Sequence, residues 1–118
     1  MIKGIEEINQ ALKEYVKEVR ETMDETFKRM ADESVDKLAQ TSPRGKSHKH
    51  YADRWAVKET PTGYIVHNKD KYQLTHLLEY GHVKRGGKGR VAAQPHIKPV
   101  EDWIIDNVES RLKRDIEN

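Results

Sequence analysis

Residues 5–40 read IEEINQALKEYVKEVRETMDETFKRMADESVDKLAQ, and this stretch decides how the chain is organised. Apolar residues recur in it at steps of three to five: Ile5, Ile8, Leu12, Val16, Val19, Met23, Phe27, Met30, Val35 and Leu38. Such spacing is typical of one face of an α-helix, and no Pro or Gly interrupts it. The other face is rich in Glu, Lys, Arg, Ala and Gln, which favour helix. The pattern predicts a long amphipathic helical arm over residues 1–40.

A helix of this length conflicts with a compact shape. At 1.5 Å per residue it reaches about 54 Å. A globule of this chain length is only about 35 Å across, with a radius of gyration of ~13–14 Å. The helix therefore either breaks near Asp32–Ser34 or projects from the globule, where its apolar stripe needs a partner. The alternative is a helix that folds back over its own sheet.

A β-hairpin is predicted next, over residues 51–68. Pro43 ends the first helix, because proline disfavours helix at the residue before it. Residues 51–58 alternate as a strand does, and residues 64–67 are rich in strand-forming side chains. The five residues between them contain Pro and Gly, as a hairpin loop would.

Two further helices are predicted after the hairpin. Residues 72–80 return to helical spacing, and Gly81 suits the end of a helix. Residues 99–116 carry apolar side chains four apart, and Pro99 suits a first helical turn. A mobile basic loop is predicted between these helices. The resulting order of helix, small antiparallel sheet, helix, loop and helix predicts an α+β fold.

The composition limits the class of protein. The chain has 118 residues, of which 35% are hydrophobic and 36% charged, and none is cysteine. This length suits one domain over residues 1–118, and the lack of cysteine excludes disulfides and thiolate chemistry. No run approaches the ~20 apolar residues of a membrane span, and the charged N-terminus lacks a signal-peptide core, so the cytosol is expected. The low apolar content indicates either partial disorder or burial supplied by neighbouring subunits.

The net charge of +2 hides a segregation of charge along the chain. Residues 1–40 carry seven Lys or Arg against ten Asp or Glu, a net −3. Residues 41–98 carry twelve against four, a net +8, and residues 99–118 carry three against six, again −3. The basic middle favours contact with a polyanion. The alternative is that the acidic flanks offset it within the chain or between subunits.

Few residues suggest reactive chemistry. His48 and His50 are near enough in sequence to chelate a metal, but no H-E-x-x-H or C-x-x-C motif accompanies them. We therefore expect no metal and no other cofactor. Glu79 lies between His76 and His82 and is a candidate acid–base partner of either. The alternative, which we favour, is that Glu79 caps or anchors the basic loop.

The basic loop, residues 82–90, reads HVKRGGKGR. It lacks the Ser or Thr after Lys that a nucleotide-binding P-loop needs, and no aromatic residue lies in it for base stacking. Its charge and flexibility instead suit contact with a phosphate backbone or with a partner protein. The candidate contact residues are Lys84, Arg85, Lys88 and Arg90. The alternative is a solvated loop without a ligand.

Two short motifs resemble those of a known family. One is a hydrophobic pair followed by Glu, an aromatic residue and Gly, and the other is a Pro-x-Ile-x-Pro run before the last helix. The matching residues are Leu78, Glu79, Tyr80, Gly81, His82, Pro95, His96, Ile97 and Pro99. They resemble a tailed-bacteriophage family named after gene product ten of a lambdoid phage. Its members are described as neck, minor tail or tail-completion proteins.

A weaker similarity lies upstream, where Ser42 and Pro43 precede Tyr51 and Trp55 as in the family. The resemblance thus covers roughly residues 41–105. It implies a structural protein of the head–tail connector or neck of a phage or prophage, with no enzymatic activity. The implied location is the virion, after assembly in the host cytoplasm.

The resemblance also implies partners. These are further copies of the chain in an oligomeric ring, the neighbouring connector and tail proteins, and the DNA that passes through the channel, which the basic loop is expected to contact. No membrane partner is expected. The alternative function is that of a small nucleic-acid-binding protein that uses the basic central segment.

Overall fold

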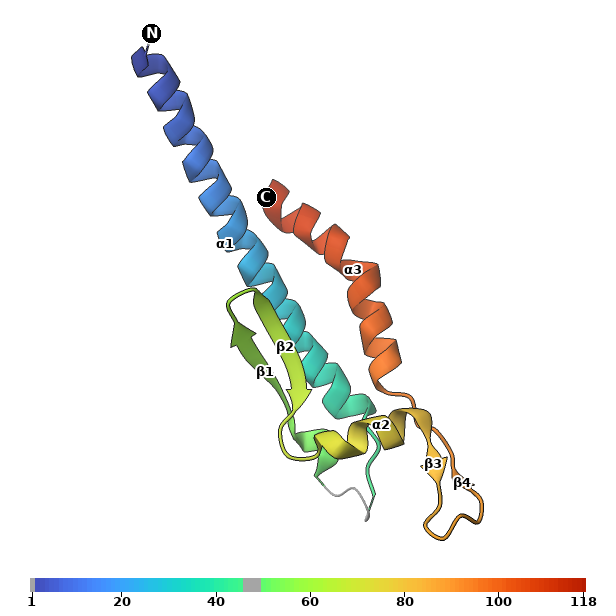
Figure 1. Cartoon of the computed structure of the whole chain (residues 1–118). Coiled ribbons are helices and arrows are strands. Elements are labelled where there is room, and N and C mark those ends of the chain that lie inside the picture. The colour runs from blue at the N-terminus through green and yellow to red at the C-terminus, as the bar shows by residue number, and fades with distance from the viewer. Residues whose placement is uncertain (1, 46–49) are drawn as a thin grey trace.

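The computed structural model describes residues 2–45 and 50–118, and it confirms the α+β fold (Figure 1). His48, one of the two histidines considered for a metal site, lies outside the described residues. The elements are α1 (Ile2–Thr41), the 3₁₀ turn η2 (Tyr51–Asp53), β1 (Trp55–Thr60), β2 (Gly63–Asn68), α2 (Tyr72–Tyr80), β3 (His82–Val83), β4 (Arg90–Val91) and α3 (Ile97–Glu117). The strands form two separate antiparallel pairs, β1–β2 and β3–β4.

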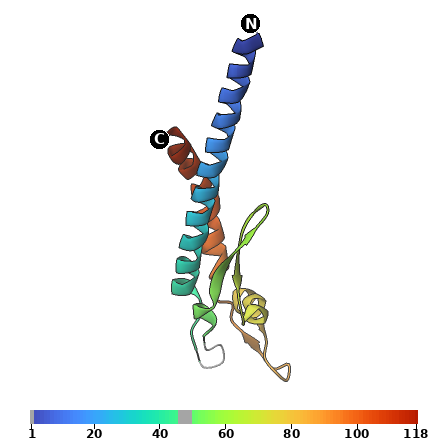
Figure 2. The same cartoon turned by 90° about the vertical axis from the view of Figure 1, so that its left-hand side faces the viewer.

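Helix α1 is continuous over its whole length, so the alternative of a break near Asp32–Ser34 is wrong. Ser34 is buried there, and its hydroxyl donates to the carbonyl of Met30 at 2.7 Å, which satisfies the polar group without disturbing the helix. The molecule therefore measures 80 × 24 × 21 Å, with a radius of gyration of 20.8 Å rather than that of a globule. The other two alternatives, a helix that projects and a helix that packs on its own chain, each hold for one half of α1. The second half packs against the rest of the chain, while residues 4–20 project beyond it (Figures 1 and 2).

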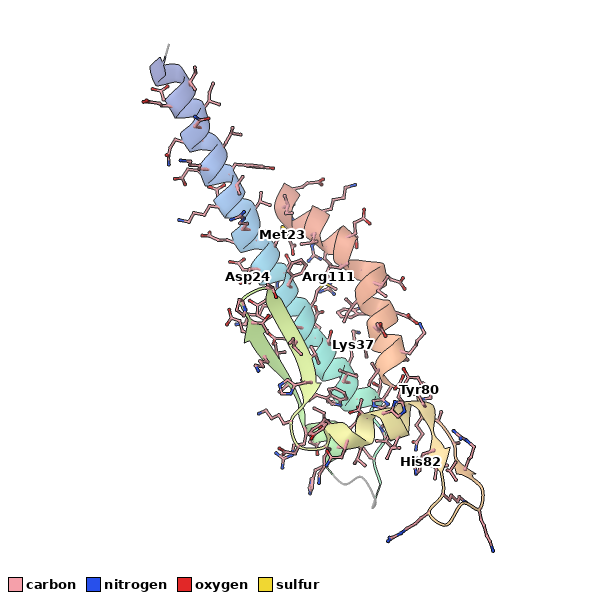
Figure 3. All side chains as sticks on the ribbon, viewed as in Figure 1. Met23, Asp24, Lys37, Tyr80, His82 and Arg111 are labelled. Carbon is pink, nitrogen blue, oxygen red and sulfur yellow. The ribbon has the colours of Figure 1, made fainter. Side chains whose placement is uncertain are left out.

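The core lies between the second half of α1, the β1–β2 hairpin and α3. Its buried apolar side chains include Met30, Leu38 and Val100. Helix α3 lies along α1, and Figure 3 shows the side chains of Lys37 and Arg111 between the two helices. Arg111 forms a two-pronged ion pair with Glu33 from α1. Apolar contact and paired charges together hold the two helices side by side.

The β1–β2 hairpin is shorter at its start than the predicted range of residues 51–68. Tyr51 begins a 3₁₀ turn instead of a strand, because its fully buried ring and its carbonyl group have partners outside any sheet. The carbonyl accepts a hydrogen bond of 2.9 Å from the side chain of Asn68. The strands then pair from Trp55 opposite Asn68 to Thr60 opposite Gly63, so the turn is two residues long.

The rest of the chain follows the prediction with two differences. The helix over residues 72–80 and its terminal Gly81 are confirmed. The last helix begins at Ile97 rather than at Pro99, because a side chain from α2 supplies partners for its first N–H groups. The segment predicted as a loop contains the short β3–β4 pair and is called the basic hairpin (residues 82–91) below. In the described residues, no helix has the length and apolar character that a bilayer span requires.

Leu38 and Leu12 test this division of α1, because one is 4% exposed and the other 57%. We expect Leu38→Ala to lower the free energy of unfolding by about 2–4 kcal/mol, since it leaves a cavity in the core. The matched Leu12→Ala change should cost less than about 1 kcal/mol in the isolated protein. Urea denaturation followed by circular dichroism measures both. Equal losses would contradict the location of the core along the second half of α1.

Candidate functional site

Glu79, at the end of α2, caps the beginning of α3. One of its carboxylate oxygens accepts hydrogen bonds from the backbone N–H groups of His96 at 2.8 Å and Ile97 at 2.9 Å. The other accepts from the N–H of Lys98 at 3.0 Å. The first N–H groups of a helix have no partner within that helix, and no side chain at the start of α3 provides one. A single buried carboxylate from another helix therefore acts as the N-cap of α3.

The environment of Glu79 keeps it ionised. Burial by itself raises the pKa of a carboxyl group, but the three backbone hydrogen bonds and the nearby His96 ring act in the opposite direction. Their combined effect outweighs burial, so the pKa of Glu79 lies below its usual value. A negative charge at the start of a helix is also favoured by the helix dipole.

The ring of His96 is fully buried and extends this network toward the hairpin. Its Nδ1 lies 2.8 Å from the carbonyl oxygen of Gln94 and 3.0 Å from the Glu79 carboxylate. Its Nε2 lies 2.7 Å from the hydroxyl of Tyr51, which in turn lies 3.2 Å from the hydroxyl of Thr75. The network joins α2, the start of α3 and the 3₁₀ turn before β1.

Aromatic packing surrounds the same network. The rings of Tyr51, Trp55 and His96 meet edge to face, with centroids 5.4–6.2 Å apart. The indole N–H of Trp55 donates to the hydroxyl of Ser42 at 2.8 Å, just after α1. Segments far apart in the sequence therefore converge on one buried cluster, which we call the His96 cluster: Ser42, Tyr51, Trp55, Thr75, Glu79 and His96.

This arrangement corrects the acid–base pairing considered from the sequence. Glu79 pairs with His96, and not with His76 or His82. His76 is exposed and packs its ring on Tyr80, and His82 follows the turn at Gly81. Figure 3 shows Tyr80 and His82 at the junction of α2 and the basic hairpin. Among the described residues, no group of three or more His, Cys, Asp or Glu side chains is placed to hold a metal ion.

Gly81 has no room for a side chain. Its φ is +76°, and a Cβ there would lie 2.6 Å from the carbonyl oxygen of Val91 and 2.9 Å from the nitrogen of Ala93. Both neighbours are backbone atoms, so neither can move aside as a flexible side chain would. Glycine thus lets the chain leave α2 and return directly against it, where the N–H of Gln94 donates to the carbonyl of Leu78 at 2.7 Å.

The basic hairpin has a hydrogen-bonded backbone and exposed charges. His82 pairs with Val91 and Val83 with Arg90. Beyond these pairs, the N–H of Lys84 donates to the carbonyl of Gly89 at 2.9 Å. The N–H of Gly87 donates to the carbonyl of Lys84, also at 2.9 Å. The side chains of the four candidate contact residues are exposed, and none takes part in an ion pair with the described residues: Lys84, Arg85, Lys88 and Arg90.

Residues 6–81 match the sequence model of a family described as "Bacteriophage HK97-gp10, putative tail-component". The chain belongs to this family. A structural role in the bacteriophage tail follows from that membership. The matched part includes most of α1 and ends at Gly81, so it lies further toward the N-terminus than the resemblance over residues 41–105 suggested. No curated protein and no solved structure matches the chain.

Within this tail component, the motif residues lie in contrasting environments. Leu78, Glu79, Gly81 and His96 are buried, and His82 and Ile97 are half-buried. Tyr80, Pro95 and Pro99 are exposed. The buried motif residues join helices to each other, and the basic residues between them lie on the surface. The sequence did not reveal the bonds of His96 to Tyr51 or of Asn68 to the 3₁₀ turn, because each depends on contact between distant segments.

Glu79→Gln tests the cap. The variant keeps the shape of the side chain but turns one acceptor oxygen into an NH₂ group that faces backbone N–H donors. We expect it to lower the free energy of unfolding of this tail component by about 3 kcal/mol at pH 7. Urea denaturation at several pH values measures the difference between the two proteins.

The difference should also depend on pH. Because the pKa of Glu79 is lower in the folded state, its ionised form stabilises the fold fully above about pH 4.5, its usual value. This contribution is lost as the pH falls through the folded-state pKa. The gap between wild type and Glu79→Gln should therefore be constant near neutrality and narrow in acid. A gap that stays constant down to the lowest pH would show that the charge is not what stabilises the cap.

Gly81→Ala and Gly87→Ala form a matched pair, since both glycines have a φ of about +76–77° but only Gly81 has atoms within 4 Å of an added Cβ. We expect Gly87→Ala to cost about 1 kcal/mol, from backbone strain alone. Gly81→Ala should cost roughly 2 kcal/mol more, because the new methyl overlaps the backbone and because a ψ of 174° with this φ is open almost only to glycine. Thermal denaturation compares them, and equal costs would contradict the close approach at Gly81.

Proposed function

We propose that the protein is a structural subunit of the phage head–tail connector, or neck, and that it acts in tail completion and head–tail joining. In this proposal it forms an oligomeric ring in the virion, assembled in the host cytoplasm, and contacts neighbouring connector and tail proteins. One observation carries the proposal. Two exposed surfaces lie at opposite ends of an elongated molecule, the amphipathic segment 4–20 at one end and the basic hairpin at the other (Figure 1).

The interior of the molecule supports a non-enzymatic role. The Glu79–His96–Tyr51 arrangement combines groups that serve acid–base chemistry elsewhere. Here, however, the Tyr51 and His96 side chains are 0% exposed, and the carboxylate is occupied by three backbone N–H groups. The Tyr51 and His96 side chains are closed to a substrate, and the hydrogen bonds of all three residues favour a role in holding segments together.

The basic hairpin is the proposed contact with DNA in the channel or with an adjoining ring. Its four cations have no carboxylate partner among the described residues. Exposed arginines elsewhere in the fold, such as Arg29, Arg44 and Arg54, do form ion pairs. Unpaired positive charge on a protruding hairpin attracts phosphates or an acidic protein surface.

The Lys84→Ala, Arg85→Ala, Lys88→Ala, Arg90→Ala variant tests this role. We expect the protein to remain folded, because all four side chains are exposed, and we expect the yield of infectious particles to collapse. The matched control removes four other exposed lysines that form no ion pair within the described part of the chain: Lys28, Lys58, Lys69 and Lys113. The control should leave the yield close to that of wild type. A normal yield from the hairpin variant would reject the proposed role of the hairpin.

The same unpaired charge is the observation that favours the second candidate, a small nucleic-acid-binding protein. Binding of duplex DNA to the isolated protein at several salt concentrations separates the two functions. Tight binding with a steep salt dependence favours the second candidate, because phosphate contacts release counterions. Weak binding by the free protein favours the connector, in which DNA is held nearby by the assembly.

A further inference from the structure

Strand β2 has one edge whose backbone groups have no partner. The N–H of Lys69 donates to the carbonyl of Arg54 at 2.8 Å, so these residues form a hydrogen-bonded pair at the open end of the β1–β2 ladder. Hydrogen-bonded and non-hydrogen-bonded pairs alternate along an antiparallel ladder. Three residues of β2 therefore direct their N–H and C=O groups away from β1: Tyr64, Val66 and Asn68. Among the described residues, no hydrogen bond reaches these six backbone groups.

This edge borders an apolar cleft between β2 and α3. One hollow of about 430 Å³ lies toward α2, and a second of about 200 Å³ lies toward the β1–β2 turn. Val66 of β2 and Ile104 of α3 line both hollows, so the two adjoin. His67 points to the opposite face of the sheet from Val66 and still lines the larger hollow, which therefore reaches the edge of the strand. Other lining residues are apolar and half-buried: Phe27, Trp55, Ile97 and Val108.

The β1–β2 sheet is too narrow to cover the helices that it faces. Helices α1 and α3 pack side by side, and a pair packed at about 8–10 Å spans roughly 20 Å in all. A sheet of two strands is only about 10 Å wide. The hairpin packs on α1, and β2 is its nearer strand to α3 (Figure 1). The side of α3 that borders the cleft, with Ile97, Ile104 and Val108, is therefore left without a strand opposite it.

The edge of β2 also lacks the charges that usually protect a strand edge. Strand β2 reads GYIVHN, without Lys, Arg, Asp or Glu, and Ile65 on its outer face is 51% exposed. Strand β1 reads WAVKET, so Lys58 and Glu59 lie along the other edge. Sheets place charged residues at their edges because an uncharged edge pairs readily with another strand. In this hairpin the uncharged strand is the one that borders the cleft.

The hairpin of a second copy does not fit this edge. The inner face of the hairpin is covered by α1 of the same chain. Because neighbouring strands are about 4.8 Å apart, a hairpin added to β2 brings its own α1 to about 10 Å from the first α1. Helix α3 already packs on that side of α1 (Figure 1). The strand that fits the edge is therefore one without a helix on its inner face.

We propose that β2 binds an extended segment of a different protein, which adds a third strand to the sheet and covers the cleft. The segment is about five residues long, as is the edge from Tyr64 to Asn68. Hydrogen bonds to the backbone of β2 hold it, as in other cases of strand addition. Every second side chain of the segment points into the cleft, which selects apolar residues at those positions.

Glu101 specifies one charged position of the segment. Its side chain lines the larger hollow, at the end of the cleft near α2. It is exposed and takes part in no ion pair within the described part of the chain. A Lys or Arg at that end of the segment therefore has an available carboxylate partner.

The inference rests on the proposed function in one respect, since it assigns a surface and a chemistry to one of the partner proteins of the connector. Strand addition to the isolated protein does not depend on that role. If a suitable strand does not bind, the site is wrong while the proposed function stands. If wild-type protein is absent from the connector of purified particles, the proposed function fails while the site stands.

Amide hydrogen exchange followed by NMR tests strand addition. The probe is a peptide of roughly seven residues in which valine alternates with threonine, with a lysine at one end. An excess of it should slow exchange at the N–H groups of Tyr64 and Val66 by about tenfold or more. The N–H groups of Ile65 and His67 are bonded to β1 and should not change. A peptide of the same composition with its valines adjacent is the control, and it should protect none of them. Unchanged exchange at Tyr64 and Val66 with the alternating peptide would overturn the proposal.

Val66→Pro and Val57→Pro form a matched pair, because the two residues lie opposite each other and neither N–H is used within the hairpin. Proline removes that N–H, which a strand edge tolerates. Val66→Pro should weaken binding of the alternating peptide by about tenfold. Val57→Pro, at the other edge of the sheet, should leave binding unchanged. Circular dichroism verifies that both are folded, and equal effects on binding would contradict the assignment to β2. If Val66→Pro does not fold, the exchange measurement on wild type decides.

Glu101→Gln tests the charged position. The change should weaken binding of the lysine peptide by about threefold, the usual effect of one exposed ion pair. It should not alter binding of a peptide with serine in place of lysine. Equal losses for the two peptides would show that Glu101 does not contact the basic residue.

Discussion

The fold depends on one carboxylate. Glu79 provides partners for three N–H groups at the start of α3, and that of His96 would otherwise be buried without a hydrogen bond. The same contact determines where α3 begins, and therefore how its apolar face meets α1. Through His96 it also reaches Tyr51 and the turn before β1. The helices and the β1–β2 hairpin are thus joined through one buried, ionised carboxylate, that of Glu79.

The polar residues of the His96 cluster explain why the motif around Glu79 suggests acid–base chemistry when only the sequence is considered. A glutamate, a histidine, a tyrosine and a threonine within hydrogen-bond reach suggest proton transfer. In this fold each polar atom is used to hold a neighbouring segment, and Gly81 brings the returning chain against α2. Such a cluster gives a small core a defined geometry, which is what a protein with little apolar material needs.

The sequence predicted the elements whose formation depends on the local spacing of apolar residues. The helical spacing of α1 and α2, and the glycine that ends α2, are properties of neighbouring residues, and both helices were found where expected. It did not predict the start of α3, because the cap comes from Glu79, 17 to 19 residues upstream. It placed Tyr51 in a strand, because the buried partners of that residue are distant in sequence. Two-residue strands such as β3 have no pattern to detect, and the pairing of Glu79 with His96 depends on the turn at Gly81.

The continuity of α1 has a mechanical consequence. The same unbroken helix holds the exposed stripe at one end and part of the buried core at the other. A straight helix of this length resists bending, so the direction of its tip and the direction of the body cannot vary independently. Anything that holds the tip at a given angle also sets the angle at which the basic hairpin, at the far end of the molecule, is presented. The molecule therefore behaves as a rigid rod, and the orientation of one end determines that of the other.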